Sequence, residues 1–376
     1  MNEPLRIIIT GGGTGGHVYP GVVVAEEIIR LSPEARLLFV GAPRGLEADV
    51  IPRLGYDIRF VDVRYFHRRL TLKNITAVYK ALAAVTAAKK IIRKFRPHAV
   101  VGTGGYVSGP VVLAAARLGV PTLIQEQNAY PGLTTRWLAS RVNVVSVSHA
   151  DAVKHISSRA HTVITGHPVR RAIFEADREQ ARRELGLSEE QQLVMVVGGS
   201  GGAQQLNQVV MEAAGNIVSQ GDTVLVHATG ARYFSWMEED YGKLSISKQL
   251  RENIWLREYI DDMPSMLAAC DLVVARAGGM MHELTAVGRP SLLVPSPNVA
   301  DDHQLHNARS MAAAGAAVVV EEHNLNAQVL ARQVTGLLAD PSRLEKMAKA
   351  AADLGKPQAG QDIARMALKL ARAQLD

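Results

Sequence analysis

The sequence of 376 residues contains a single cysteine, Cys270. One cysteine cannot form an internal disulfide or supply several thiolates to a metal, so disulfide-rich secreted domains and cysteine-based zinc folds are excluded. The chain also lacks an Asp-x-Asp motif of the kind that holds a metal–nucleotide complex, and neither of its glycine-rich turns continues into the Gly-Lys-Ser/Thr of a P-loop. The residues that carry the function must therefore lie outside disulfides, cysteine-based metal sites and these two nucleotide-binding motifs.

Long hydrophobic runs are scarce as well. The longest stretch without charge, Ala99–Ala116, contains four glycines and Pro110. This composition favours a strand, a loop and a buried helix over a membrane span. Met1–Arg6 has no signal-peptide pattern, so the sequence predicts a protein that is not secreted and that contacts a membrane only peripherally.

Positive charge is unevenly distributed along the chain. The formal net charge is +6. Met1–Thr165 carries 21 basic and 10 acidic residues, a net of +11, whereas Gly166–Asp376 carries 21 and 26, a net of −5. The basic half indicates an anionic partner for that half.

Short β-branched segments alternate with longer helical segments along the whole chain, which predicts an α/β fold with parallel, buried sheets. The pattern starts twice, because RIIITGGGTGG at Arg6–Gly16 and LVMVVGGSGG at Leu193–Gly202 are both strands running into a glycine-rich turn. We expect two doubly wound domains facing across a cleft, with Arg170–Ser188 beginning the second. Ligands in such sheets bind beyond the carboxyl ends of the strands.

The glycine turns bring backbone N–H groups and a helix N-terminus to a ligand. Gly11–Gly16 satisfies G-x-G-x-x-G, but the next strand, Arg36–Val40, ends without the carboxylate that a dinucleotide ribose requires. A single loop is compatible with a simple tight turn. Two loops at equivalent places favour ligand binding.

Several polar residues follow predicted strands. His17 comes directly after the first glycine turn, where it is either a general base or a histidine packed in the wall. Gln125–Asn128 suits recognition of a sugar or base, with ordinary loop polarity as the alternative. Asp301, Asp302, His303 and His306 fit no metal-ligand set, so we expect no metal there.

A basic segment accounts for much of the N-terminal charge. Arg64–Arg69 precedes a predicted helix at Ile75–Arg96, whose end carries Lys89, Lys90, Arg93, Lys94 and Arg96. It is either a core-packed helix with a solvated basic end or a surface attracted to anionic membrane lipids. A pattern of stacking aromatics interleaved with the basic residues is absent, so nucleic acid is not expected.

Five motifs together resemble one family in type and order, namely Gly11–Pro20 (GGGTGGHVYP), Val101–Pro110 (VGTGGYVSGP), Gln125–Leu138 (QEQNAYPGLTTRWL), Gly198–Asn207 (GGSGGAQQLN) and Ala300–Met311 (ADDHQLHNARSM). They are similar to the MurG family of peptidoglycan N-acetylglucosaminyltransferases, which have the GT-B architecture. The resemblance implies a fold of two Rossmann-like domains with the last helix returning to the first. The expected domains are an acceptor- and membrane-facing one at 1–164 with about 358–376, and a donor-binding one at 165–357.

The resemblance also implies the reaction. N-acetylglucosamine passes with inversion from UDP-N-acetylglucosamine to undecaprenyl-pyrophosphoryl-N-acetylmuramoyl-pentapeptide, on the cytoplasmic face of the plasma membrane. It implies no required metal or cofactor, and partners among cell-wall or division proteins. His17 is our first choice for the catalytic base and Glu126 the second.

The resemblance also assigns substrate binding to individual residues, by their positions in the matching motifs. Thr14, Gly15 and Gly16 fall where the family contacts the donor sugar, Asn128 matches its sugar-binding Asn, and Arg170 its donor-binding Arg.

In the second half, Ser200 matches a phosphate-binding Ser and Ile260 a position holding uracil by backbone contacts. Glu283 matches the ribose carboxylate and Gln304 a Gln at the sugar.

Two departures from the family pattern stand out: His167 replaces an Asn, and the loop Ala277–His282 is one residue short. The alternatives to this function are a UDP-sugar epimerase, a transferase acting on another lipid and a non-catalytic nucleotide-sugar binder.

Overall fold

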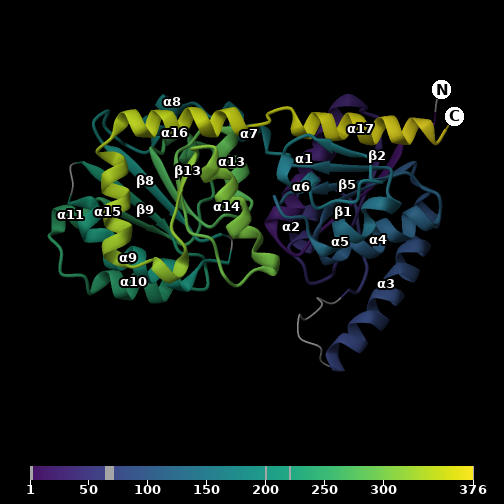
Figure 1. The fold of residues 1–376 in the computed structure, drawn as a ribbon, viewed down its shortest axis with the longest axis horizontal. Coiled ribbons are helices and arrows are strands. Elements are labelled where there is room, and N and C mark those ends of the chain that lie inside the picture. The colour runs from purple at the N-terminus through teal and green to yellow at the C-terminus, as the bar shows by residue number, and fades with distance from the viewer. Residues whose placement is uncertain (1–2, 64–71, 200, 220–221, 376) are drawn as a thin grey trace. The chain divides into compact units, whose positions relative to one another are not determined.

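The computed structural model describes residues 3–63, 72–199, 201–219 and 222–375, without the side chains of 72–82 and 300. Arg64–Arg69 therefore lies outside the described residues. The chain forms two compact units (Figure 1), an N-terminal unit of Met1–Arg170 with Lys356–Asp376 and a C-terminal unit of Arg171–Gly355.

The N-terminal unit is built on a parallel sheet in the order β3-β2-β1-β4-β5-β6-β7. Its strands are β1 (Arg6–Gly11), β2 (Arg36–Gly41), β3 (Ile58–Phe60), β4 (Ala99–Gly104), β5 (Thr122–Glu126), β6 (Val144–Val147) and β7 (Thr162–Ile164). The strand order reverses between β1 and β4, the place where ligands bind in doubly wound folds.

Helices cover both faces of this sheet. They are α1 (Gly15–Leu31), α2 (Glu47–Arg53), α3 (Leu72–Phe95), α4 (Gly105–Arg117), α5 (Leu133–Leu138), η1 (Ala139–Arg141), α6 (Ala150–Val153) and α17 (Ala359–Ala373). Successive side chains of a strand point to opposite faces. Accordingly Ile7 and Ile9 of β1 pack with α1 and α17, whereas Ile8 packs with α3 and α4.

The last helix, α17, belongs to the N-terminal unit although it follows the whole C-terminal unit in the sequence. Its apolar face, which includes Ile363, Ala367 and Leu368, is buried in the same cluster as Val22 and Ile28 of α1. The expected return of the C-terminal helix is thus confirmed.

The C-terminal unit repeats the architecture with a parallel sheet in the order β10-β9-β8-β11-β12-β13. Its strands are β8 (Gln192–Val197), β9 (Thr223–Ala228), β10 (Ile254–Arg257), β11 (Leu272–Ala275), β12 (Ser291–Leu293) and β13 (Ala317–Val319). The two sheets have the same order over their first six strands, which confirms two Rossmann-like doubly wound domains.

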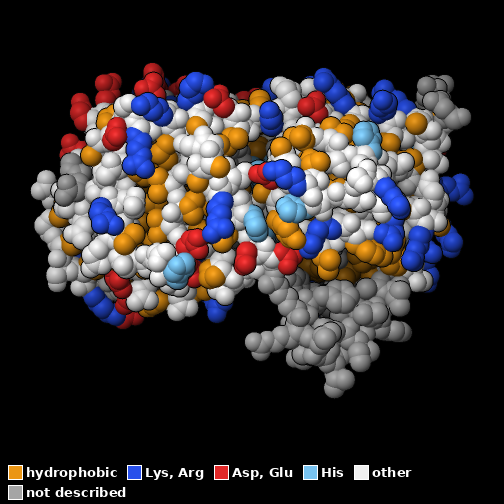
Figure 2. All heavy atoms as spheres, viewed as in Figure 1, with side chains coloured by type: hydrophobic (Ala, Val, Ile, Leu, Met, Phe, Trp, Pro, Cys, Tyr) orange, Lys and Arg blue, Asp and Glu red, His pale blue; other side chains and the backbone are white. Residues whose placement is uncertain are grey.

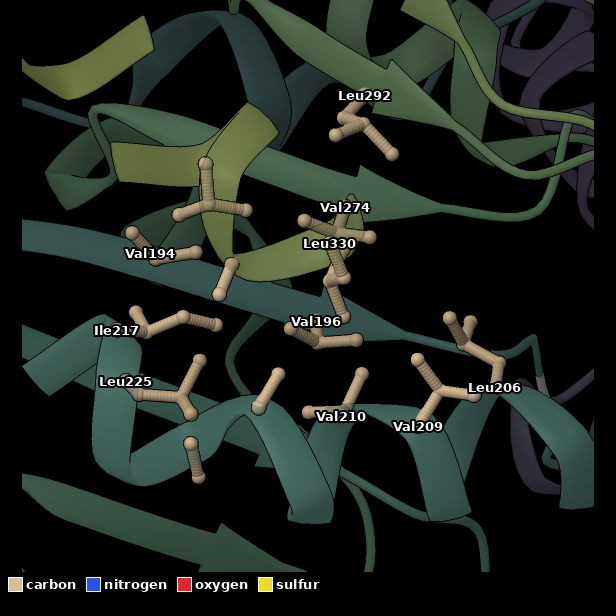
Figure 3. Close-up of a cluster of buried hydrophobic side chains, with 14 of the residues drawn as sticks. Val194, Val196, Leu206, Val209, Val210, Ile217, Leu225, Val274, Leu292 and Leu330 are labelled. Atoms are coloured by element: carbon tan, nitrogen blue, oxygen red, sulfur yellow. The ribbon is translucent and has the colours of Figure 1, made fainter. Parts of the chain in front are cut away.

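The core of the C-terminal unit lies between this sheet and its helices. Figure 3 shows Val194 and Val196 of β8 facing Leu206, Val210 and Ile217 of α9. The helices are α7 (Arg171–Glu175), α8 (Arg178–Glu184), α9 (Gln204–Val218), α10 (Phe234–Gly242), α11 (Lys248–Glu252), α12 (Met263–Ala269), α13 (Met280–Ala286), η2 (Ala300–Asp302), α14 (His303–Ala313), η3 (Glu322–Asn324), α15 (Ala327–Leu338) and α16 (Pro341–Leu354).

Two helices of the N-terminal unit begin with glycines of the preceding turns. Helix α1 starts at Gly15, and α4 starts at Gly105. Both contain a proline, Pro20 or Pro110, in the second turn, where the missing N–H removes one helical hydrogen bond. Buried packing of the following turns sustains these helices.

The long uncharged run resolves into β4 and α4, as expected. Among the described residues, no helix combines the length and the hydrophobicity that crossing a bilayer demands.

Candidate functional site

The first glycine turn lies at the carboxyl edge of the N-terminal sheet, between β1 and α1. Gly11 has no room for a side chain, because a Cβ there would lie 2.0 Å from Thr103 Oγ1. A Cβ at Gly105 would lie 2.1 Å from the Gly12 carbonyl oxygen. The turns after β1 and β4 therefore pack backbone against backbone, which brings the N-termini of α1 and α4 to the point where the strand order reverses.

His17 lies in the first turn of α1 and contacts two polar side chains. Its Nδ1 is 3.0 Å from Thr14 Oγ1, and its Nε2 is 3.1 Å from Gln127 Nε2. The amide N–H of Gln127 donates to Nε2, so the ring proton belongs on Nδ1, which donates to Thr14. The Thr14 hydroxyl is thereby used on the histidine and does not cap the helix. In this tautomer the lone pair of Nε2 accepts the hydrogen bond from Gln127.

Glu126 ends β5 rather than following it. Its Oε1 accepts hydrogen bonds from Asn128 N at 3.0 Å and Asn128 Nδ2 at 3.1 Å, and its Oε2 accepts from Gly132 N at 3.1 Å. The side chain is buried. The carboxylate thus fixes the loop that carries Asn128 and Gln127, a positioning role that suits it better than proton transfer.

Arg170 closes the N-terminal unit in the sequence and lies beside α1. Its guanidinium carbon is 5.2 Å from the centroid of the Tyr19 ring, within cation–π range. His167, which stands where the family pattern has an Asn, is buried. Its Nδ1 lies 3.2 Å from Gln125 Nε2. Burial lowers the pKa of His167 to about 3, so the ring is neutral.

The C-terminal unit contains a cavity of about 670 Å³ at the carboxyl edge of its sheet. Gly198 and Gly202 of the second glycine turn line it, together with Arg276, Gln304 and Glu322. Gln304 Oε1 accepts a hydrogen bond from Ser296 N at 2.9 Å. The volume is typical of small-molecule sites.

Arg276 and Glu322 form a largely buried ion pair in the wall of this cavity. Arg276 Nη1 also donates to the Val294 carbonyl oxygen at 3.1 Å. Sequence reasoning did not single out either residue. A charged residue directly after a buried strand is a sequence signal for a binding site, and Arg276 fits this signal. Nothing in the sequence links Arg276 to Glu322.

A buried polar network supports the second glycine turn and was likewise missed. His227 Nδ1 lies 2.9 Å from the Tyr241 hydroxyl, and His227 Nε2 lies 3.2 Å from Asn207 Oδ1. Asn207 Nδ2 donates to the Thr229 carbonyl oxygen at 2.9 Å. A Cβ at Gly202 would lie 2.2 Å from that same oxygen, so the network holds the strand end against which the turn packs.

The other residues expected to bind the donor substrate lie at different places in the C-terminal unit. Gln304 lines the cavity, whereas Ile260 is buried after β10 and Glu283 lies in the first turn of α13, after β11. Both follow carboxyl ends of parallel strands. Ser200 lies outside the described residues.

In the part of the chain that the structure describes, no group of three or more His, Cys, Asp or Glu side chains is placed to hold a metal ion. Asp301 and Asp302 instead adopt left-handed backbone conformations before α14.

The described end of α3 combines a buried and a basic side. Val85, Ala88 and Ile92 are core residues, whereas Lys90, Arg93 and Lys94 are exposed. Figure 2 shows Lys and Arg side chains in blue spread over the N-terminal unit, and a concentration of red Asp and Glu on the C-terminal unit. The helix is therefore packed in the core and also presents positive charge.

Comparison with known proteins gives consistent matches. The glycosyltransferase family 28 N-terminal domain matches residues 7–147, and the family 28 C-terminal domain matches residues 193–363. A UDP-N-acetylglucosamine--N-acetylmuramyl-(pentapeptide) pyrophosphoryl-undecaprenol N-acetylglucosamine transferase of Acetivibrio thermocellus is 40% identical, covering 96% of both chains. The protein of the same name from Moorella thermoacetica is 42% identical, covering 97% of this chain and 99% of its own.

The fold agrees with a solved relative. The crystal structure of Acinetobacter baumannii MurG superposes with a TM-score of 0.77 at 26% identity, covering 97% of this chain and 100% of that one. These matches span both units and include every motif on which the resemblance was based. The chain therefore belongs to glycosyltransferase family 28, among the MurG N-acetylglucosaminyltransferases.

Proposed function

We propose that the protein transfers N-acetylglucosamine from UDP-N-acetylglucosamine to undecaprenyl-pyrophosphoryl-N-acetylmuramoyl-pentapeptide, the membrane-linked precursor of peptidoglycan. The observation that carries the proposal is the 40–42% identity, over nearly the full length, with transferases named for this reaction. That identity favours the transferase over the epimerase and the simple binder.

The donor is assigned to the C-terminal unit. Its cavity adjoins the second glycine turn and the N-terminus of α9, where backbone N–H groups and the helix dipole favour a pyrophosphate. Ser200 is assigned to the phosphate, Ile260 to uracil, Glu283 to ribose and Gln304 to the sugar. Thr14, Gly15, Gly16, Asn128 and Arg170 are assigned to the donor from the N-terminal unit.

The reaction is a displacement with inversion at the anomeric carbon. His17 Nε2 accepts the proton of the acceptor 4-hydroxyl while the oxygen of that hydroxyl bonds to C1. The bond from C1 to the pyrophosphate oxygen breaks, and its electron pair leaves with UDP. The N-terminus of α9, Ser200 and Arg170 stabilise the charge that develops on the leaving group.

The acceptor and the membrane are assigned to the N-terminal unit. Exposed Lys90, Arg93 and Lys94 at the end of α3 supply positive charge for anionic lipid headgroups and for the pyrophosphate-linked acceptor. We place the enzyme peripherally on the cytoplasmic face of the plasma membrane.

The deciding experiment supplies UDP-N-acetylglucosamine and a short-chain analogue of the muramoyl-pentapeptide lipid. We expect a lipid-linked disaccharide and free UDP, measured by mass spectrometry. A parallel reaction without lipid reports an epimerase through isomerised UDP-sugar. UDP binding with no product on this acceptor would refute the proposed reaction.

A further inference from the structure

Glu47 is a buried carboxylate beneath the first glycine turn, and the function described above does not use it. It begins α2 and its side chain is 1% exposed. Its Oε2 accepts a hydrogen bond from Gly13 N at 2.8 Å, and its Oε1 accepts one from Ala42 N at 2.8 Å. The carboxylate thus joins the turn after β1 to the turn after β2.

Three glycines are shaped around this side chain. A Cβ at Gly12 would lie 2.1 Å from Glu47 Oε1, one at Gly45 2.1 Å from Oε2, and one at Gly41 2.4 Å from Cγ. Such distances are far below van der Waals contact, so a larger residue at any of the three would displace the carboxylate. The glycines after both strands therefore form a close-fitting site for this one anion.

The oxygens of Glu47 are held by backbone N–H groups. In the described part of the chain no lysine or arginine side chain pairs with them. An N–H group at this place in a dinucleotide-binding turn serves a ligand's phosphate. Here the protein's own carboxylate takes the Gly13 N–H, and its charge also contributes to the raised pKa of Tyr106, after burial.

We propose that Glu47 is a positioning residue for the transfer reaction. Its carboxylate fixes the backbone at Gly13, and thereby orients the Thr14 hydroxyl and the His17 imidazole for proton transfer. Gly13 adjoins Thr14, whose hydroxyl lies 3.0 Å from His17 Nδ1, so a shift of the backbone at Gly13 would turn the ring that carries the base Nε2. The inference rests on the proposed function, because it assigns Glu47 to the same reaction.

The first test is Glu47→Gln, which keeps the volume and removes the charge. One of the two N–H donors then faces an amide NH₂ instead of an acceptor. We expect kcat to fall at least tenfold, with the Kd for UDP within twofold of the parent. The matched control is Asp49→Asn on the same helix, where an exposed carboxylate pairs with Arg53; it should leave both unchanged.

A double-mutant cycle separates positioning from general structural damage. If Glu47 acts through His17, then Glu47→Gln should lower kcat less than twofold in a His17→Ala background. An equal loss in both backgrounds would overturn the proposal, as would a Glu47→Gln variant with kcat within twofold of the parent.

Thermal unfolding checks that the variant is folded at the assay temperature. If Glu47→Gln is unfolded, Glu47→Asp replaces it in the cycle, because it keeps the charge and the reach of one oxygen; the same loss of effect in the His17→Ala background is expected. Failure of the proposed function would appear differently, as absence of disaccharide product with the unaltered protein.

Discussion

His17 owes its chemistry to its immediate surroundings. Thr14 and Gln127 hold the two ring nitrogens, so the imidazole has one tautomer before any substrate binds. Fixing the orientation of the ring in advance lowers the entropic cost of bringing the base to the acceptor hydroxyl. The role of proton acceptor can be tested separately from donor binding, since the second glycine turn belongs to the other unit.

We predict that His17→Ala lowers kcat by about a hundredfold or more, in line with the usual contribution of a general base. UDP should bind with unchanged affinity, as measured by calorimetry. Exposed His323 supplies a control, and His323→Ala should retain full turnover. Near-normal kcat in His17→Ala would transfer the role of base to another group.

Gln304 is expected to distinguish the sugar from the nucleotide. Its carboxamide lines the cavity of the C-terminal unit and is oriented by Ser296 N. We predict that Gln304→Ala raises the KM for UDP-N-acetylglucosamine about tenfold, the cost of roughly one hydrogen bond. The Kd for UDP alone, which has no sugar, should stay within twofold.

The exposed Gln180 on α8 provides the matched substitution, Gln180→Ala, which should alter neither constant. A parallel rise in the Kd for UDP would place Gln304 at the nucleotide instead.

Residues adjacent in the sequence were the predictable part of the site. Thr14 and His17 are three positions apart, and a glycine turn followed by a histidine already indicates a site. Glu47 and Gln127 were out of reach, because their contacts with this turn join positions 34 and 110 residues apart. The same holds for Arg276 and Glu322, which only the folded sheet brings together.

At the scale of elements, α3 combines a structural and a surface role. Val85, Ala88 and Ile92 bury one face against the N-terminal sheet, while Lys90, Arg93 and Lys94 face solvent. Positive side chains near an anionic bilayer contribute about 1 kcal/mol each. The basic end can therefore govern membrane affinity without affecting the core.

We predict that changing Lys90, Arg93 and Lys94 to Gln weakens binding to anionic phospholipid vesicles about tenfold or more, while UDP affinity is retained. Vesicle sedimentation gives the binding constant. The control changes three exposed cations of α16, namely Arg343, Lys346 and Lys349, and should bind as the parent does. Equal loss in both variants would mean that only net charge matters.

The strands of both sheets were largely predictable, because each is a short buried run between polar turns. Strands β8, β9 and β11 are examples, since nearly all of their residues are buried. The starts of α1 and α4 were not predictable, since glycine and proline normally disfavour a helix and only tertiary packing supports these first turns. The stretch Arg170–Ser188 contains two short helices, α7 and α8.

At the scale of the whole molecule, each unit contains a deeply buried neutral histidine. Burial lowers the pKa of His167 and of His227 to about 3, from 6.5. Between these values the unfolded chain binds more protons than the folded one. The free energy of unfolding therefore falls as the pH drops below about 6.5, and it continues to fall until the pH approaches 3.

We predict that each histidine costs its unit about 2 kcal/mol of unfolding free energy between pH 7.5 and pH 5. Denaturant unfolding at several pH values measures this. His227→Gln should remove that part of the pH dependence from the C-terminal unit, whereas His323→Gln on the surface should leave it. A His227→Gln variant with the parent's pH dependence would contradict the assignment.

The return of α17 has a consequence for biosynthesis. The hydrophobic cluster around β1 and α1 is completed by Ile363, Ala367 and Leu368, which emerge from the ribosome only after every residue of the C-terminal unit. The unit that is made first is therefore finished last. Until α17 has emerged, the apolar face of α1 that α17 covers stays without its partner, and the later-made unit is the first that can complete its core.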